Sequence, residues 1–203
     1  IFFLINGPLE MALPYILSIT GRESLLGLLL GAMNLGALSG AVTIALIGRV
    51  RRRMPIILAG YGLLGIMLIG YGVARHPVLI AFSIFWAMFP LPLAGALFTS
   101  ILQVKTPADL QGRVFALTGQ MFMLATPFSF LITGALVDRL LEPAVHRSGW
   151  RIVAPLVGRQ EGSGMGLLLV IVGAIILITT LAAALSPRLR RLESDLPDYN
   201  SSS

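Results

Sequence analysis

Long runs of apolar residues, separated by short stretches that carry the charges, constrain this chain more than any other feature. A bilayer hydrocarbon core of about 30 Å requires roughly 20 apolar residues in a helix. Backbone groups inside a bilayer must also hydrogen-bond within their own segment, so each run predicts a transmembrane α-helix. The six predicted spans cover approximately residues 1–19, 24–47, 54–74, 78–103, 113–137 and 164–186.

Composition supports an all-α membrane protein and argues against a soluble one. Hydrophobic residues make up 56% of the 203 residues and charged residues only 12%, whereas soluble domains average roughly 25% charged residues. The mean hydropathy is +0.89. A net charge of +6 does not indicate nucleic-acid binding, because the arginines lie in short loops beside apolar runs, where the positive-inside rule accounts for them.

The distribution of Lys and Arg predicts the orientation in the membrane. One side carries Arg49, Arg51, Arg52, Arg53, Lys105, Arg113, Arg188, Arg190 and Arg191, and the other carries Arg22, Arg75, Arg139, Arg147, Arg151 and Arg159. We expect the more basic side to be cytoplasmic, which places both ends of a six-span bundle (1–186) in the cytoplasm. The polar tail 187–203 is predicted to be disordered.

Residue types that build metal and catalytic sites are scarce. The chain has no cysteine, and its two histidines, His76 and His146, fall in predicted loops. We therefore expect no metal site, no cofactor and no enzymatic activity. An intramembrane enzyme would need a Ser–His or paired-Asp arrangement within the spans, and the sequence provides none.

Asn6 and Glu10 are the first candidates for a transport site. They are spaced i, i+4 in the first span and therefore share one side of that helix. A carboxyl group at mid-bilayer costs about 2.5–3.5 kcal/mol, so it usually faces a protein interior or an aqueous cavity. Glu10 is thus the leading candidate for a proton-coupling or cation-binding group. The alternative is that the span begins further upstream and leaves Glu10 near the interface without a role.

Prolines interrupt two of the predicted spans. Pro8 and Pro14 lie in the first span, and Pro90 and Pro92 lie in the fourth. Each removes a backbone hydrogen bond and kinks its helix. In two inverted three-helix repeats these spans are counterparts, and interrupted counterparts indicate a transporter's central site. Coincidence is the alternative, because proline is frequent in membrane helices.

Polar and aromatic residues in the other spans predict a cavity for a bulky amphipathic or cationic solute. The candidates are Asn34, Gln120, Trp86 and Phe89, with Phe85 and Phe122 as further aromatic surface. Interhelical hydrogen bonding by the amides and packing of the aromatics in lipid are the alternatives. Glycines predict helix contacts, or alternatively hinges, at Gly27, Gly31, Gly36, Gly40, Gly60, Gly62, Gly65, Gly70 and Gly72.

Charges near the helix ends are candidates for latches that open and close during transport, with simple topology signals as the alternative. These candidates are Arg49, Arg52, Arg53, Asp109, Arg113, Asp138 and Arg139. Thr106 and Pro107 further predict the N-cap and first residue of a short surface helix that leads into the fifth span. Asp109 and Arg113 then lie one turn apart and can pair weakly.

Three stretches resemble the bacterial exporter branch of the major facilitator superfamily, which includes enterobactin-exporter-like and macrolide-efflux-like members. Thr106–Ala116 resembles the loop between the tenth and eleventh helices of that branch, and Asp138–Ala144 with Gly162–Gly166 resembles the outer loop before its last helix. One departure is that Gly48–Arg53 keeps the basic run of the family's second loop but lacks its acid, which puts a charge latch there in doubt.

The resemblance implies the C-terminal half of a twelve-helix carrier in a bacterial plasma membrane. A six-helix half would precede Ile1, and the first, second, fourth and fifth spans would line a central cavity. The implied activity is proton-coupled efflux of a hydrophobic or amphipathic small molecule, such as a drug or siderophore. The partners would be lipid, protons, the solute and the missing half. A non-transporting membrane scaffold and, less favoured, a six-span membrane enzyme are the alternatives.

Overall fold

A computed structural model describes residues 2–10, 23–48, 50 and 52–186. Every regular element within these residues is helical. Five of the helical segments are long and apolar enough to cross a membrane: Leu25–Ile47, Arg53–Val73, Pro77–Lys105, Ala108–Ala144 and Ser163–Leu185. The first predicted span is described only as far as residue 10, and Pro14 and the tail 187–203 lie outside the described residues.

The described helices have the following order in the chain. They are α1 (Phe2–Glu10), α3 (Glu23–Ile47), α4 (Arg53–Val73), α5 (Pro77–Met88), α6 (Pro90–Lys105), α7 (Ala108–Leu136), α8 (Glu142–Ala144), α9 (Ala154–Val157) and α10 (Ser163–Leu185). A π-helical turn, η1 (Val137–Leu141), joins α7 to α8, and a 3-10 helix, η2 (Ser148–Ile152), precedes α9. The fourth predicted span is therefore broken into α5 and α6 at Phe89, directly before Pro90.

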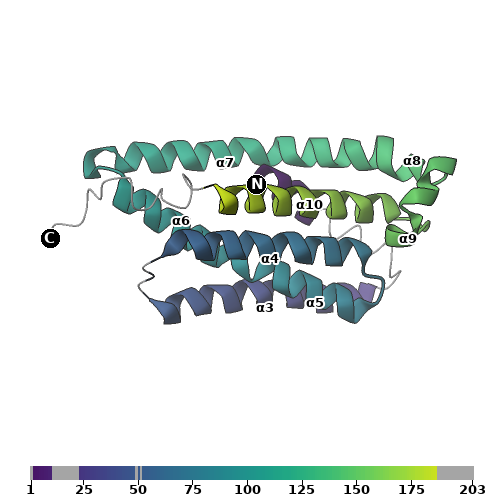
Figure 1. Ribbon diagram of the computed structural model, residues 1–203, viewed down its shortest axis with the longest axis horizontal. Coiled ribbons are helices and arrows are strands. Elements are labelled where there is room, and N and C mark those ends of the chain that lie inside the picture. Colours follow the sequence, from purple (N-terminus) through teal and green to yellow (C-terminus); the bar gives the residue numbers. More distant parts are fainter. Residues whose placement is uncertain (1, 11–22, 49, 51, 187–203) are drawn as a thin grey trace.

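The pair α4 and α10 forms the centre of the bundle (Figure 1). A Cβ atom added at Gly65 would lie 2.9 Å from the carbonyl oxygen of Gly173, and Gly72 faces the carbonyl of Gly166 in the same way. Small residues at both positions allow the two backbones to approach closely. Gly27, Gly31 and Gly62, by contrast, have no atom within 4 Å of the added Cβ, so these three predicted contact glycines make no such contact.

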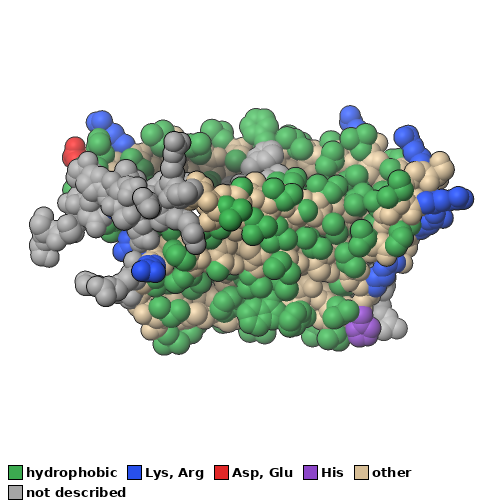
Figure 2. Space-filling view, viewed as in Figure 1, with side chains coloured by type: hydrophobic (Ala, Val, Ile, Leu, Met, Phe, Trp, Pro, Cys, Tyr) green, Lys and Arg blue, Asp and Glu red, His purple; other side chains and the backbone are tan. Residues whose placement is uncertain are grey.

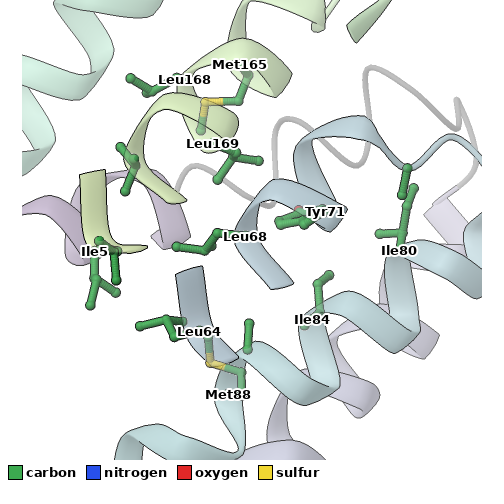
Figure 3. Close-up of a cluster of buried hydrophobic side chains, with 14 of the residues drawn as sticks. Ile5, Leu64, Leu68, Tyr71, Ile80, Ile84, Met88, Met165, Leu168 and Leu169 are labelled. Atoms are coloured by element: carbon green, nitrogen blue, oxygen red, sulfur yellow. The ribbon is translucent and has the colours of Figure 1, made fainter. Parts of the chain in front are cut away.

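A continuous apolar core surrounds this pair. Leu64, Leu68 and Tyr71 of α4 and Leu169 and Ile176 of α10 are fully buried. Figure 3 shows how side chains from α1 and α5 join them, among them Ile5, Ile80, Ile84 and Met88. The core thus ties the first and fourth predicted spans to the central pair.

The remaining long helices lie on opposite sides of the centre. In Figure 1, α7 runs along one edge beyond α10, while α3 and α5 run along the other edge below α4. The end of α3, the start of α4 and the link 106–107 are at one end of the bundle, and the link 74–76 and the segment 137–162 are at the other. Since α7 contacts α1 and α3 contacts α5 and α6, the two edges have separate partners.

The predicted short surface helix after Thr106 is not a separate element. Thr106 is the extended C-cap of α6 and Pro107 is the N-cap of α7, which then runs without a break from Ala108. The carbonyl oxygen of Pro107 accepts from the N–H groups of Leu110 and Gln111, so Pro107 rather than Thr106 is the N-cap and the helix begins one residue later than expected. The side chain of Gln111 links the start of α7 to the end of α6, because its Nε2 donates to the carbonyl oxygens of Gln103 (2.9 Å) and Thr106 (3.2 Å).

Candidate functional site

The seam between α1 and α7 contains the clearest buried polar contact between two spans. The backbone N–H of Gly7 donates to Oγ of Ser129 over 2.8 Å, and the contact is buried. Thr133, one turn further along α7, is also buried and lies against Gly7. Any side chain at Gly7 would overlap Ser129 and Thr133. This buried hydrogen bond therefore links two helices that are far apart in the sequence, since its two partners are 122 residues apart.

Asn6 and Glu10 flank this seam on α1. Asn6 is half-buried and directly precedes Gly7. Pro8 is buried inside the same helix and has no N–H to donate, which weakens the helix at this point. Glu10 is the last residue of α1, and its side chain lies outside the described residues. Its part in proton coupling stays a prediction.

The polar residues of α3 use their donors within their own helix. Nδ2 of the exposed Asn34 donates to the carbonyl oxygen of Leu30 over 2.8 Å. Oγ of Ser39 donates to the carbonyl oxygen of Leu35, and Oγ1 of Thr43 to that of Ser39. Such bonds satisfy the side-chain donors without a second helix and tend to bend the helix that carries them.

The middle of α7 is exposed on every side. All residues of 119–124 are exposed, including Gln120 and the apolar Met121, Met123 and Leu124. Gln120 lies nine residues before Ser129, or about 13 Å along the helix axis. Gln120 is therefore not part of the seam with α1, and this stretch of α7 has room for a partner or a solute.

The aromatic candidates form a chain of ring contacts at the break in the fourth span. The ring centroids of Phe85 and Trp86 are 5.4 Å apart, and those of Trp86 and Phe89 are also 5.4 Å apart. Phe82 extends the series, with its centroid 6.3 Å from that of Trp86. Edge-to-face contacts of this kind fix the ring orientations. The side chains of Phe85, Trp86 and Phe89 are each half-buried, so part of their surface remains open.

Two backbone carbonyls at this break lack their helical donors. Pro90 and Pro92 have no N–H to give to the carbonyl oxygens of Trp86 and Met88, which are four residues earlier. The neighbouring helix α3 packs against this region, where its Gly36 and Gly40 face the carbonyl oxygens of Phe85 and Phe89, respectively. The close approach of α3 thus covers the backbone of the last turn of α5 as far as the break at Phe89.

The predicted site residues are distributed over several helices. Asn6 belongs to the α1–α7 contact, and Trp86 and Phe89 belong to the α3–α5 contact, while Asn34 and Gln120 are exposed on the outer helices. The apolar core, which contains Ile5 of α1 and Met88 of α5, connects the two contacts. A single cavity lined by all of the predicted residues stays a prediction.

The predicted latch charges lie at opposite ends of the bundle. Arg52 is exposed and Arg53 half-buried at the start of α4, whereas Asp138 and Arg139 are exposed in η1 at the far end (Figure 1). The arginines at the start of α4 therefore cannot pair with Asp138. Asp109 and Arg113 are both exposed at the start of α7, and Arg49 lies outside the described residues.

Sequence reasoning missed the role of Glu142. Its Oε1 accepts from the N–H of Gly162 (2.7 Å) and its Oε2 accepts from the N–H of Gly164 (3.0 Å). The carboxylate thus caps the first turn of α10, where free amides and the helix dipole favour a negative charge. In the sequence, the stretch Gly-Ser-Gly before an apolar run indicated a helix start with free backbone amides. No local pattern indicated that an acid 20 residues earlier would accept hydrogen bonds from them.

Comparison with known proteins finds distant similarity to an efflux protein. The chain is 29% identical over 107 residues to macrolide efflux protein A of Streptococcus pyogenes, and also to the same protein of S. pyogenes serotype M6. The aligned part covers 52% of this chain and 26% of each relative. No protein-family model and no solved structure matches the chain significantly.

Proposed function

We propose that this chain forms half of a secondary transporter that exports a hydrophobic or amphipathic small molecule, with a macrolide-like drug as the first candidate. One observation carries the proposal. In a chain distantly similar to a macrolide efflux protein, a tightly packed helix pair, α4 and α10, is flanked by two outer helices whose apolar faces are uncovered. Such an arrangement suits a transporter in which α4 and α10 stay packed together while the outer helices on either side of them move.

The exposed faces of α3 and α7 support a second bundle as a partner. On α3 the uncovered side chains include Leu35 and Leu38, and on α7 they include Leu117 and Met123. Because the aligned part is only 26% of the relative's length, we infer that another set of helices packs against these faces. The solute would then bind between the two bundles, near Asn34, Gln120 and the open surface of Trp86 and Phe89.

Membrane placement and coupling complete the proposal. The end with Arg52, Arg53, Lys105 and Arg113 faces the cytoplasm of a bacterial plasma membrane, in line with the positive-inside rule. We propose six spans, with the first formed by α1 and the residues that follow it, in two inverted three-helix repeats. Protons couple to export through Glu10, because an acid within a span is costly unless it has a function.

Efflux by the intact protein tests the carrier. The complete reading frame that encodes this chain is expressed in an efflux-deficient bacterium, and accumulation of erythromycin and of the lipophilic cation ethidium is measured. Export predicts lower accumulation of at least one compound, reversed by a protonophore. Unchanged accumulation of both, with the protein present in the membrane, contradicts the proposed drug efflux.

Proton coupling is tested separately. We expect Glu10→Gln to abolish efflux driven by a pH gradient in everted vesicles, because the amide cannot carry a proton between the two sides. Glu161→Gln, which removes an exposed acid at one end of the bundle, is the matched control and should retain efflux. Full activity of Glu10→Gln would remove this carboxyl group from the mechanism and leave the carrier itself intact.

A further inference from the structure

The segment 137–162, which connects α7 to α10, is a small folded unit rather than a loose loop. Val145, Trp150 and Val157 are buried together and pack against Leu167 and Val170 of α10. Nε1 of Trp150 donates to the carbonyl oxygen of Gly158 over 2.6 Å in a buried contact. With Glu142 also bonded to the first turn of α10, the segment is fixed at several points to the end of the bundle.

This rigid unit displays apolar side chains where the spans have ended. Ile152 is 84% exposed and Leu156 is 51% exposed. Among the described residues, they are the two large exposed hydrophobics that lie outside the five membrane-length helices. Exposure of Ile152 is not a consequence of loose structure, because the neighbouring Trp150 is buried and hydrogen-bonded.

Arginines lie at the same end of the bundle as these two side chains. Among the side chains that the structure describes at this end of the bundle, the exposed arginines are Arg75, Arg139, Arg147, Arg151 and Arg159, and the carboxylates are Asp138, Glu142 and Glu161. Figure 2 shows basic side chains gathered at this end of the molecule. Since the carboxylate of Glu142 is occupied by two backbone amides, the surface has an excess of positive charge available to a ligand.

We propose that the segment lies in the membrane interface and binds the headgroups of anionic phospholipids. Ile152 and Leu156 enter the boundary of the acyl chains, as apolar residues of interfacial segments do. The guanidinium groups of Arg147, Arg151 and Arg159 bind the phosphodiesters, whose oxygens match the planar guanidinium fork. Both types of side chain lie in the segment that joins the end of α7 to the start of α10. Each arginine contributes about fivefold to the preference for an anionic lipid.

Trp150 provides a local reporter for this proposal. The chain has two tryptophans, so Trp86→Phe leaves Trp150 as the single fluorophore within the segment. The purified chain is reconstituted into vesicles that mix phosphatidylglycerol with phosphatidylcholine, and either one lipid or the other is brominated. We expect brominated phosphatidylglycerol to quench Trp150 more strongly than brominated phosphatidylcholine at equal mole fraction.

Variants distinguish the two parts of the contact. Replacing Arg147, Arg151 and Arg159 by Gln should lower the preference for phosphatidylglycerol more than about tenfold. The matched pair Arg52→Gln with Arg113→Gln, at the opposite end of the bundle, should leave quenching of Trp150 unchanged. Ile152→Ser with Leu156→Ser should reduce quenching by both lipids. The emission maximum of Trp150 shows in each case whether the segment remains folded.

The remaining outcomes overturn the proposal. Equal quenching by the two lipids, or a triple arginine variant that keeps the preference, would show that the charges do not select lipid. Loss of the preference on adding inorganic phosphate at constant ionic strength would assign the arginines to a free anion. An absence of quenching by either lipid would mean that protein covers the segment. None of these results depends on whether the chain exports drugs.

Discussion

At the scale of single residues, the polar groups that matter most are those whose partners belong to another helix. Asn34, Thr43, Thr118 and Thr126 donate to carbonyls of their own helices, so they add little to the arrangement of the bundle. Ser129 is different because it accepts a hydrogen bond from α1. Its bond holds a short helix that a proline has already weakened.

Ser129→Ala should therefore destabilise the protein by about 1 kcal/mol, since the buried N–H of Gly7 then loses its acceptor. Ser39→Ala is the matched control, because the hydroxyl of Ser39 donates only to carbonyls of its own helix, and it should be close to neutral. Thermal unfolding of the purified protein in detergent measures both. Equal melting temperatures for the two variants would contradict a stabilising role for the α1–α7 bond.

At the scale of helices, contact between α4 and α10 depends on the absence of side chains. A methyl group at Gly65 would press on the carbonyl of Gly173 and on Leu177, whereas a methyl group at Gly62 meets open space. The two positions are on the same helix and three residues apart. Comparing an alanine substitution at each position therefore separates the effect of packing against α10 from the intrinsic preference of alanine for helices.

We expect Gly65→Ala to destabilise the bundle by about 1–3 kcal/mol through overpacking against a rigid backbone. Gly62→Ala should be neutral or more stable by up to about 1 kcal/mol, because alanine is the better helix former. Resistance to unfolding by SDS, followed by circular dichroism, measures the difference. A similar loss in both variants would mean that α4 and α10 do not pack through Gly65.

Helix positions were predictable from the sequence, but helix partners were not. Apolar runs of membrane length marked the segments that became α3, α4 and α10, and the two prolines marked the break at Phe89. Hydrophobicity reports only that a segment prefers lipid or protein to water, so it could not say that α7 would contact α1. The bonds from Ser129 and from Glu142 reach 122 and 20 residues along the chain, beyond any local pattern.

The same reasoning explains what the sequence predicted about the candidate site. Asn34, Gln120 and Trp86 stood out because polar or aromatic groups are rare in apolar runs. Tertiary packing places α3 with Asn34 against α5 with Trp86 and leaves Gln120 on α7 apart from them, and residue type does not encode that packing. Glu10 was singled out on the same grounds, and its role remains a prediction.

At the scale of the whole molecule, apolar side chains cover the outside as well as the core (Figure 2). Exposing this apolar surface to water would be unfavourable, whereas in a bilayer it contacts lipid tails that are equally apolar. Because lipid and protein are then similar surroundings for an apolar side chain, close packing decides which helices associate. Exposure in this structure can therefore mean contact with lipid, with a second bundle or with a water-filled passage. Gln120 on α7 and Ile178 on α10 are both exposed, and we expect Gln120 to face the passage of the proposed carrier and Ile178 to face lipid.

Thiol labelling distinguishes these environments in the complete protein once any cysteines outside these 203 residues, which contain none themselves, are replaced by serine. A thiol reacts with a membrane-impermeant maleimide as the thiolate, which forms in water and is suppressed in apolar surroundings. Gln120→Cys should therefore react at least about tenfold faster than Ile178→Cys, and an exported compound should slow the reaction by filling the passage. Equal, slow labelling of both cysteines in the complete protein would place Gln120 in lipid or at a dry interface. The exposed middle of α7 would then be a packing surface, and the solute would have to pass elsewhere.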